Sequence, residues 1–393
     1  MRSIARVHSV DAYRGLVMLL MLAEVLRSCD VAAAVGHLRL WDFVCLEQSH
    51  VPWTGASLHD LIQPGFYFLV GVGLALSLHR RLSSGQTRAQ LTRHAFTRAL
   101  LLVLLGMALV AVHPRQWSWW FDDTLTQIGL AYPWLFGIAL RSRRERWIAL
   151  AGILFTYWLW FALSPVQSVS AAAPPPGVSP EWLNLHGLSG FSAHWQKNAN
   201  PAWAFDRWFL NLFPRDVPFT GNDNGLTTLN FIPSIATMIL GLVAGDRLRT
   251  SGTAANKLRF LSGAGILLVC TGWLLGWLGI VPVVKAIWTP SWVLYSGGWC
   301  FLFLAAFFVL VDVAGYRRLV FPLTVIGLNS IVAYSLSHLF PALAFNSIRR
   351  VVGSGLFQLA GTIYEPAAYG VAVLLLYWLV LYVLYWRRIF VRI

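Results

Sequence analysis

The amino-acid sequence predicts an all-α polytopic membrane protein, with about ten transmembrane helices packed in one bundle. Of its 393 residues, 57% are hydrophobic and only 12% are charged, and the mean hydropathy is +0.62. Soluble globular domains carry about 25% charged residues, so a soluble fold is disfavoured. Apolar runs of about 20 residues recur along the chain, a length that lets a helix cross the hydrocarbon core. The runs are continuous and not alternating, which favours helices over the strands of a membrane barrel.

Ten apolar segments are predicted to cross the membrane. They are residues 12–27, 58–79, 96–112, 125–140, 147–163, 228–245, 258–281, 291–311, 319–340 and 366–386. An even number of spans places both termini on the same side of the membrane. The loops on that side carry about twice as many Lys and Arg as the opposite loops, so the positive-inside rule places both termini in the cytoplasm. We expect residues 1–393 to form one transmembrane domain, with one long extracytoplasmic loop at residues 164–226.

The strong positive charge of the chain has an explanation other than nucleic acid. The net charge is +14, but the basic residues lie in short loops between the predicted spans, so no nucleic-acid partner is predicted. Two basic groups on the predicted cytoplasmic side are Arg80 with Arg81, and Arg141 with Arg144. Both can act as topology signals beside anionic lipid or can bind a polyanionic substrate, and the sequence leaves these interpretations open.

The long outer loop begins with a Pro-rich spacer and continues with aromatic and hydrogen-bonding side chains. The candidates for ligand contact in its second part are His194, Trp195, Lys197, Asn198, Asp206 and Trp208. Indoles stack on pyranose rings and planar polar groups bind hydroxyls, so this composition is typical of a saccharide-binding surface. Tryptophan also anchors proteins at the membrane interface, and both interpretations remain open for a chain with 20 tryptophans.

A short polar passage at residues 48–65 precedes the second predicted span. It contains His50 directly before a rigid Val-Pro-Trp segment that ends at Trp53. Histidine titrates near neutral pH, so His50 can act as a general base or accept an acyl group. Ser57 and Asp60 have the spacing of a capping box. Asp60 can therefore cap the helix, orient a neighbouring group, or do both.

Polar groups inside predicted spans are costly and are treated as functional candidates. Glu24 lies toward the outer end of the first span, and Asn329 lies within the ninth, where it could equally pack against another helix. Cys29 and Cys45 share one predicted outer loop, and the sequence leaves open whether they pair. Since there is no His-Glu-x-x-His, Cys-x-x-Cys, Walker or Gly-x-Ser-x-Gly motif, no metal site is predicted and metal-dependent hydrolysis is disfavoured.

Five passages, spread in order over nearly the whole chain, carry a resemblance to a known family. They are residues 9–15, 50–64, 225–233, 285–291 and 327–331. Together they resemble the heparan-α-glucosaminide N-acetyltransferase-like family of transmembrane acyltransferases, in its bacterial branch. The resemblance implies a multi-pass protein of the bacterial inner membrane that transfers an acetyl group from cytoplasmic acetyl-CoA to the amine of a glucosamine outside. It assigns the catalytic role to the histidine of the His-x-Pro-Trp motif, which is His50.

The resemblance and the residue chemistry together suggest how roles are divided. His50 deprotonates the sugar ammonium or accepts the acetyl group transiently, and Asn329 or another donor stabilises the oxyanion. A hydroxyl acceptor, which is a poorer nucleophile, would need a stronger base arrangement, such as His50 with Asp60 or Glu24. The family has an asparagine near the outer end of the first span, where this chain has Glu24 or its neighbour. Further candidate contacts to the saccharide acceptor are Trp53, Lys285 and Trp288, and candidate contacts to acetyl-CoA are Arg80, Arg81, Arg141 and Arg144.

Several alternatives remain open from the sequence. The acceptor can be a hydroxyl of an exported or cell-wall polysaccharide, and transfer can be direct or pass through an acetyl-histidine. Other functions are a small-solute or sugar transporter and a non-catalytic sensor or scaffold. Transporters are often built from inverted repeats, and no such repeat is evident here. The lipid bilayer and a saccharide are the expected partners, and a homodimer is compatible with the sequence.

Overall fold

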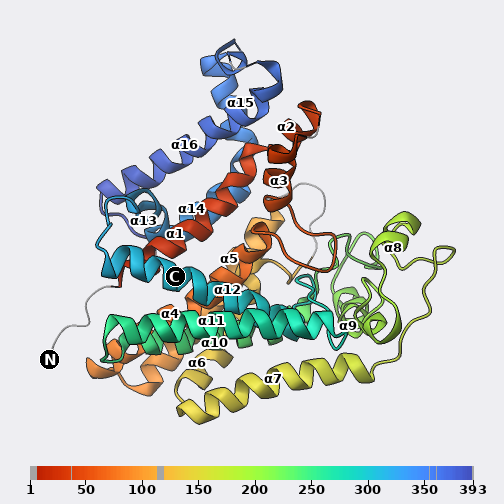
Figure 1. Ribbon diagram of the computed structural model, residues 1–393, viewed down its shortest axis with the longest axis horizontal. Coiled ribbons are helices and arrows are strands. Elements are labelled where there is room, and N and C mark those ends of the chain that lie inside the picture. The colour runs from red at the N-terminus through yellow and green to blue at the C-terminus, as the bar shows by residue number, and fades with distance from the viewer. Residues whose placement is uncertain (1–6, 37, 113–118, 354, 360, 392–393) are drawn as a thin grey trace. The chain divides into compact units, whose positions relative to one another are not determined.

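The computed structural model describes residues 7–36, 38–112, 119–353, 355–359 and 361–391. These residues form helices and loops (Figure 1). The only β pairing among them consists of isolated bridges between Thr54 and Val284 and between Ser170 and Ala173. The all-α class is therefore confirmed for the described part of the chain. The charge bias predicts a cytoplasmic position for both ends of the chain. Residues 1–6 and 392–393 lie outside the described residues.

Among the described residues, seven helices are long and apolar enough to cross a membrane, or up to eight if one bent pair counts as a single span. The seven are His59–Ser83, Arg88–Ala111, Arg143–Leu163, Thr228–Arg249, Ala254–Trp277, Pro290–Val313 and Thr362–Trp386. This count is based on helix length and composition. It is consistent with a polytopic membrane protein, but the predicted count of ten is not confirmed.

Two of the remaining predicted spans form helices that are too short to be counted. The first, residues 12–27, coincides with α1 (His8–Leu22), which is 15 residues long and continues as a 3-10 turn, η1 (Ala23–Leu26). The chain then turns at Arg27, which adopts a left-handed conformation with φ 51°. The predicted span at residues 125–140 coincides with α6 (Thr124–Ala139), which has 16 residues.

The third difference concerns the predicted span at residues 319–340. It is divided at Asn329 into α13 (Phe321–Leu328) and α14 (Ser330–Leu339). The next helix, α15 (Pro341–Val352), is bent by 73° from α14. Proline has no backbone N–H and is favoured at the first position of a helix, which explains why a new helix starts at Pro341.

The chain packs as two compact units. The first contains residues 52–55 and 63–302. Its helices are α4 (Ile62–Ser83), α5 (Arg88–Ala111), α6, α7 (Arg143–Leu163), α8 (Pro180–His186), α9 (Pro201–Phe209), α10 (Phe231–Arg249), α11 (Ala254–Trp277) and most of α12 (Pro290–Phe307). Helices α4 and α10 cross closely, because a Cβ at Gly71 would overlap the carbonyl of Met238 and one at Gly241 would overlap that of Phe68. Small residues commonly allow such approaches between membrane helices.

The second unit contains the described residues within 5–51, 56–62 and 303–393. Its helices are α1, α2 (Ser28–Ala34), α3 (Arg39–Glu47), α13, α14, α15 and α16 (Glu365–Trp386). Helices α1 and α13 also cross closely, since a Cβ at Gly15 would overlap the Leu323 carbonyl and one at Gly327 would overlap that of Asp11. Gly15 and Gly327 lie in two of the passages that carry the family resemblance. These two passages therefore include the glycines that allow α1 and α13 to pack closely.

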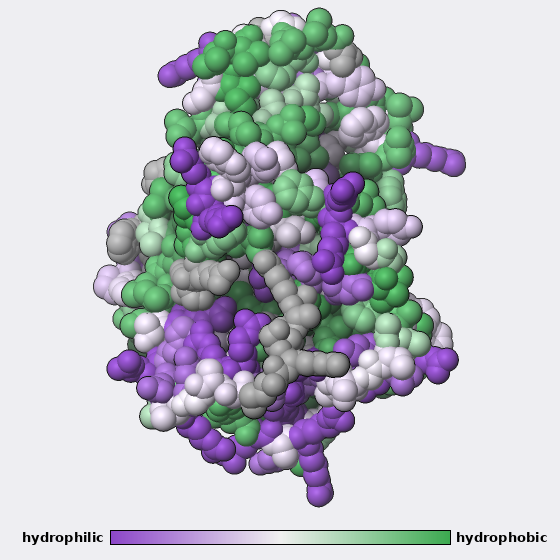
Figure 2. All heavy atoms as spheres, turned by 90° about the vertical axis from the view of Figure 1, so that its left-hand side faces the viewer, coloured by the Kyte–Doolittle hydropathy of each residue, from purple (hydrophilic) through white to green (hydrophobic). Residues whose placement is uncertain are grey.

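Apolar side chains remain on the surface of several long helices. On α11, Leu267 is 66% exposed and Trp277 is 71% exposed, and on α5, Leu100 is 59% exposed. Hydrophobic side chains also cover broad areas of the face drawn in Figure 2, where hydrophilic side chains gather in separate zones. Large exposed apolar areas indicate contact with a membrane or a partner, and on helices of this length lipid is the expected contact.

Candidate active site

The polar passage before α4 brings a histidine and a carboxylate into contact. The Nδ1 atom of His50 lies 2.7 Å from Oδ1 of Asp60. The Asp60 side chain is 1% exposed, whereas the His50 side chain is 59% exposed. Both residues belong to the second unit, in the loop after α3 and in the turn η2 (His59–Leu61) that precedes α4. The buried carboxylate thus holds one nitrogen of an imidazole that solutes can reach.

The second carboxylate oxygen of Asp60 organises the loop around the histidine. Its Oδ2 accepts hydrogen bonds from the backbone N–H groups of Val51 and Ser57, both at 3.2 Å, and lies 3.0 Å from the Ser57 hydroxyl. The backbone N–H of Asp60 in turn donates to the Ser57 hydroxyl at 3.2 Å. The capping-box spacing therefore corresponds to reciprocal bonds between these two residues, and the same carboxylate also orients His50.

This arrangement selects a chemical form of the imidazole. When the proton of neutral His50 is on Nδ1, it donates to Asp60 and makes Nε2 the basic ring nitrogen. The carboxylate also stabilises the imidazolium that forms after Nε2 takes a proton. The pair therefore has the geometry of a general base with an orienting carboxylate.

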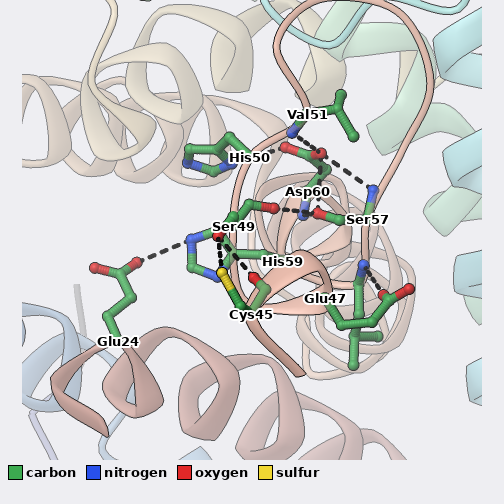
Figure 3. Close-up of polar contacts among 10 residues, drawn as sticks. Glu24, Cys45, Glu47, Ser49, His50, Val51, Ser57, His59 and Asp60 are labelled. Atoms are coloured by element: carbon green, nitrogen blue, oxygen red, sulfur yellow. Dashed lines mark hydrogen bonds and ion pairs between the residues drawn. The ribbon is translucent and has the colours of Figure 1, made fainter. Parts of the chain in front are cut away.

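A second histidine–carboxylate pair lies beside the first, as Figure 3 shows. The Nε2 atom of His59 is 3.2 Å from Oε1 of Glu24, and the ring centroids of His50 and His59 are 4.5 Å apart. Glu24 is a candidate from the sequence, whereas His59 was not predicted. A usable signal was its position at the start of an apolar span, where an ionisable residue is unusual.

The loop that carries His50 is held on both sides. Cys29 and Cys45 form a disulfide between α2 and α3, which settles the pairing that the sequence leaves open. The hydroxyl of Ser49 donates to the carbonyl of Cys45 at 2.7 Å, and the carbonyl of Ser49 accepts from Ser57 at 2.6 Å. The carboxylate of Glu47 accepts from the N–H of Leu58 at 2.7 Å.

Asn329 has other partners. Its amide Nδ2 donates to the carbonyl of Ile389 at 3.1 Å, and its Oδ1 accepts from the N–H of Val391 at 3.1 Å. The side chain is fully buried. These two hydrogen bonds tie the break between α13 and α14 to the C-terminal segment. The structure thus brings Asp60 and Glu24 to the His50 group and engages the Asn329 amide elsewhere.

Three of the tryptophans proposed as acceptor contacts lie in the core of the first unit. Trp53 and Trp195 are 2% and 0% exposed, and the Trp53 indole donates to the Trp195 carbonyl at 3.2 Å. Trp288 is also 0% exposed, and its indole donates to the Thr237 hydroxyl at 3.1 Å. Lys285, in the same segment as Trp288, is half-buried. The positions of these indoles favour packing over stacking on a sugar.

The polar residues of the long loop are largely occupied in holding that loop. The Asn198 amide donates to the carbonyls of Pro176 and Asn222 at 2.7 and 2.9 Å, and Asp206 accepts from the N–H of Thr228 at 2.9 Å. A ring nitrogen of His194 lies 2.9 Å from the carbonyl of Ser164. By contrast, Trp208 is 60% exposed.

Among the candidate residues of this loop, Lys197 and Asp206 have a shifted pKa. The ammonium of Lys197 lies 4.6 Å from the ring centroid of Trp182, and burial lowers the pKa of the amine. Burial raises the pKa of Asp206 to about 7, although the hydrogen bond from Thr228 favours the charged form. Both groups belong to the first unit, and their contacts are compatible with a structural role in the loop.

The basic candidates for donor binding lie at helix ends of the first unit. Arg80 and Arg81 are in the last turn of α4, with Arg80 exposed and Arg81 half-buried. Arg141 and Arg144 are exposed at the start of α7, where Arg141 lies 3.8 Å from Glu145. Among the described residues, no group of three or more His, Cys, Asp or Glu side chains is arranged to hold a metal ion.

Comparison with known proteins gives a consistent result. No family model matches the chain. The chain is 25% identical to the human heparan-alpha-glucosaminide N-acetyltransferase over 370 residues, which cover 84% of the chain and 52% of that protein. It is 24% identical to the mouse protein of the same name over 367 residues, covering 84% and 53%. The chain therefore spans about half the length of the curated relatives it matches. We conclude that the chain resembles the heparan-alpha-glucosaminide N-acetyltransferases, as its sequence motifs predict.

Proposed function

We propose that the protein is a transmembrane acetyltransferase with His50 at its centre. It moves an acetyl group from cytoplasmic acetyl-CoA to an amino sugar of the glucosamine type, or a related saccharide, on the extracytoplasmic side of a bacterial inner membrane. The observation that carries the proposal is the exposed His50 imidazole held at 2.7 Å by the buried Asp60. The names of the two mammalian relatives support the general reaction class.

In the direct reaction, Nε2 of His50 removes a proton from the acceptor nitrogen. The nitrogen lone pair attacks the thioester carbonyl, and the C–S bond then breaks. The sulfur leaves as a thiolate and is protonated to give free CoA, while Asp60 stabilises the His50 imidazolium during the step. In the covalent route, Nε2 itself attacks the thioester and carries the acetyl group to the acceptor.

The donor site is proposed on the opposite side of the membrane. Acetyl-CoA carries several phosphate charges, and Arg80, Arg81, Arg141 and Arg144 supply positive charge at the ends of α4 and α7. Arginine binds phosphate through paired N–H donors, which suits it to this role. We therefore assign the phosphates of acetyl-CoA to these residues.

The test is the release of CoA from acetyl-CoA by purified protein in nanodiscs, with and without glucosamine. We compare wild type, His50→Ala, and a control variant, His94→Ala, at an exposed histidine of α5. Glucosamine-dependent release that is lost only in His50→Ala is the expected result. Release that survives in His50→Ala would remove the catalytic assignment, and no release with any amino sugar would reject the proposed function. Recovery of labelled acetyl on His50 without acceptor would identify the covalent route.

A further inference from the structure

The proposed reaction leaves the Glu24–His59 pair without a role. Glu24 comes from η1, after α1, and His59 from η2, before α4, so residues 35 positions apart in sequence meet through the fold of the second unit. Their 3.2 Å contact lies next to His50, because the two imidazole centroids are 4.5 Å apart. The carboxylate–imidazole arrangement of the first pair is therefore repeated within one group (Figure 3).

The exposure of the second pair is reversed relative to the first. In the first pair the carboxylate is 1% exposed and the imidazole 59% exposed. In the second pair the His59 side chain is 9% exposed, whereas the Glu24 side chain is 56% exposed. The group thus presents one reachable base, His50, and one reachable anion, Glu24.

Alcohol and amine acceptors differ in the number of protons that the site must remove. Transfer of an acetyl group to an alcohol moves the hydroxyl proton to the sulfur and releases no net proton. An amino sugar is mostly an ammonium ion at pH 7. Its nitrogen must lose two protons to become an amide, of which one ends on the CoA sulfur and one must leave the site. An amine acceptor therefore requires a place that binds a cation and a second group that takes a proton.

We propose that Glu24 and His59 meet these two requirements. Glu24 binds the acceptor ammonium, and the His59–Glu24 pair takes the proton that His50 does not return to the CoA sulfur. This assignment rests on the proposed acetyltransferase function and specifies an amine acceptor for it. One N–H bond of the ammonium breaks and its proton moves to His59. From His59 the proton passes through Glu24 to water. No oxidation or further reactant is involved. In this assignment Glu24 is a binding residue and His59 a proton acceptor beside the catalytic His50.

The charges around Glu24 agree with this role. The groups that act on its carboxylate electrostatically are the imidazoles of His59, His50 and His338. His338, on α14, stacks on Tyr334 with ring centroids 4.2 Å apart and has a ring nitrogen 2.9 Å from the Tyr334 carbonyl. The 3.2 Å contact with His59 gives the carboxylate a direct path for a proton, and the exposure of the Glu24 side chain leaves it open to a cation.

Two acceptors separate the proposal from a structural role. Glucosamine tests the ammonium acceptor, and hydroxylamine, which is mostly uncharged at pH 7, tests acetyl transfer to a neutral nitrogen. The variants are Glu24→Gln, which removes the charge and keeps the shape, and His59→Asn. The control is Glu47→Gln, because Glu47 is another carboxylate that holds the same loop, through the N–H of Leu58.

We expect Glu24→Gln to lower the ratio of kcat/KM for glucosamine to that for hydroxylamine by about tenfold, mainly through KM, since a charge-assisted contact is lost. His59→Asn is expected to lower the same ratio mainly through kcat. Glu47→Gln is expected to change both acceptors by the same factor. An unchanged ratio in Glu24→Gln, with transfer still dependent on His50, would overturn this inference and leave the proposed function intact. Absence of transfer to both acceptors in the wild type would reject the proposed function itself, and the inference with it.

Discussion

The Nδ1 atom of His50 lies 2.7 Å from a carboxylate oxygen of Asp60, and the carboxylate is almost completely buried while the imidazole is exposed. Asp60 reaches this position because the Ser57–Asp60 turn starts η2 and α4, so the start of a helix also orients the proposed base. The relationship links the stability of the loop to the chemistry of His50. It also leads to the first prediction.

Replacement of Asp60 by Asn should lower kcat by about 100-fold or more, with a smaller change in KM, because the imidazolium loses its negative partner. The measurement is steady-state acetyl transfer to glucosamine. Ser57→Ala is the control, since it removes the hydroxyl bonds to Asp60 and keeps the carboxylate beside His50. A kcat for Asp60→Asn equal to that of Ser57→Ala would contradict the orienting role.

The disulfide between Cys29 and Cys45 should stabilise the loop before His50. It closes a segment with a sequence separation of 16, and a loop of this length contributes about 3 kcal/mol in the chain-entropy model. We expect a reducing agent to lower the midpoint of thermal unfolding of the wild type and to increase protease cleavage between α2 and α3. A Cys29→Ser/Cys45→Ser variant should have the lower midpoint from the start and should not respond to the reductant. Equal midpoints in all four conditions would rule out a stabilising role.

Replacement of Gly15 by Ala should destabilise the contact between α1 and α13. A Cβ at this position would overlap the Leu323 backbone, so the helices must separate, and overpacking of this kind costs about 1–3 kcal/mol. Gly152→Ala on α7 is the matched control, because a Cβ there meets no atom within 4 Å. Thermal unfolding in detergent should show a lower midpoint for Gly15→Ala and no decrease for Gly152→Ala. Two equal shifts would contradict the close crossing.

The raised pKa of Asp206 predicts a stability that depends on pH. Burial raises the pKa to about 7 in the folded chain, above the ordinary value of about 4. Between these values the folded state holds the proton that the unfolded state has lost, so this contribution to stability is largest at low pH and is lost as the pH rises toward 7. Asp206→Asn removes the titration. Its unfolding midpoint relative to wild type should therefore rise between about pH 4 and pH 7 and level off above pH 7.

The control for this prediction is Asp223→Asn, which removes an exposed carboxylate from the same loop. It accounts for the loss of one negative charge without the change at a buried site. A difference between Asp206→Asn and wild type that does not vary with pH would show that folding does not raise the pKa of Asp206.

The hydrophobic composition by itself determined the class of the protein. In lipid the backbone polar groups need internal partners, so long continuous apolar runs can be satisfied by helices whatever the details of packing. The polar passage around His50 and the spacing of Ser57 and Asp60 could also be recognised in the sequence, because a capping box depends on residues three positions apart. These are local relationships.

Only the tertiary structure decided the features that depend on distant residues. The predicted ninth span breaks at Asn329, whose amide binds backbone groups of Ile389 and Val391, 60 and 62 positions away. Composition alone does not show whether an indole lies in a core or on a surface, and Trp53 and Trp195 lie in the core because the long loop folds over them. The meeting of Glu24 with His59 likewise requires η1 and η2 to pack together. The physical reason is that the direction and burial of a side chain depend on residues that are distant in sequence and close in the fold. A sequence pattern describes only residues that are near one another along the chain.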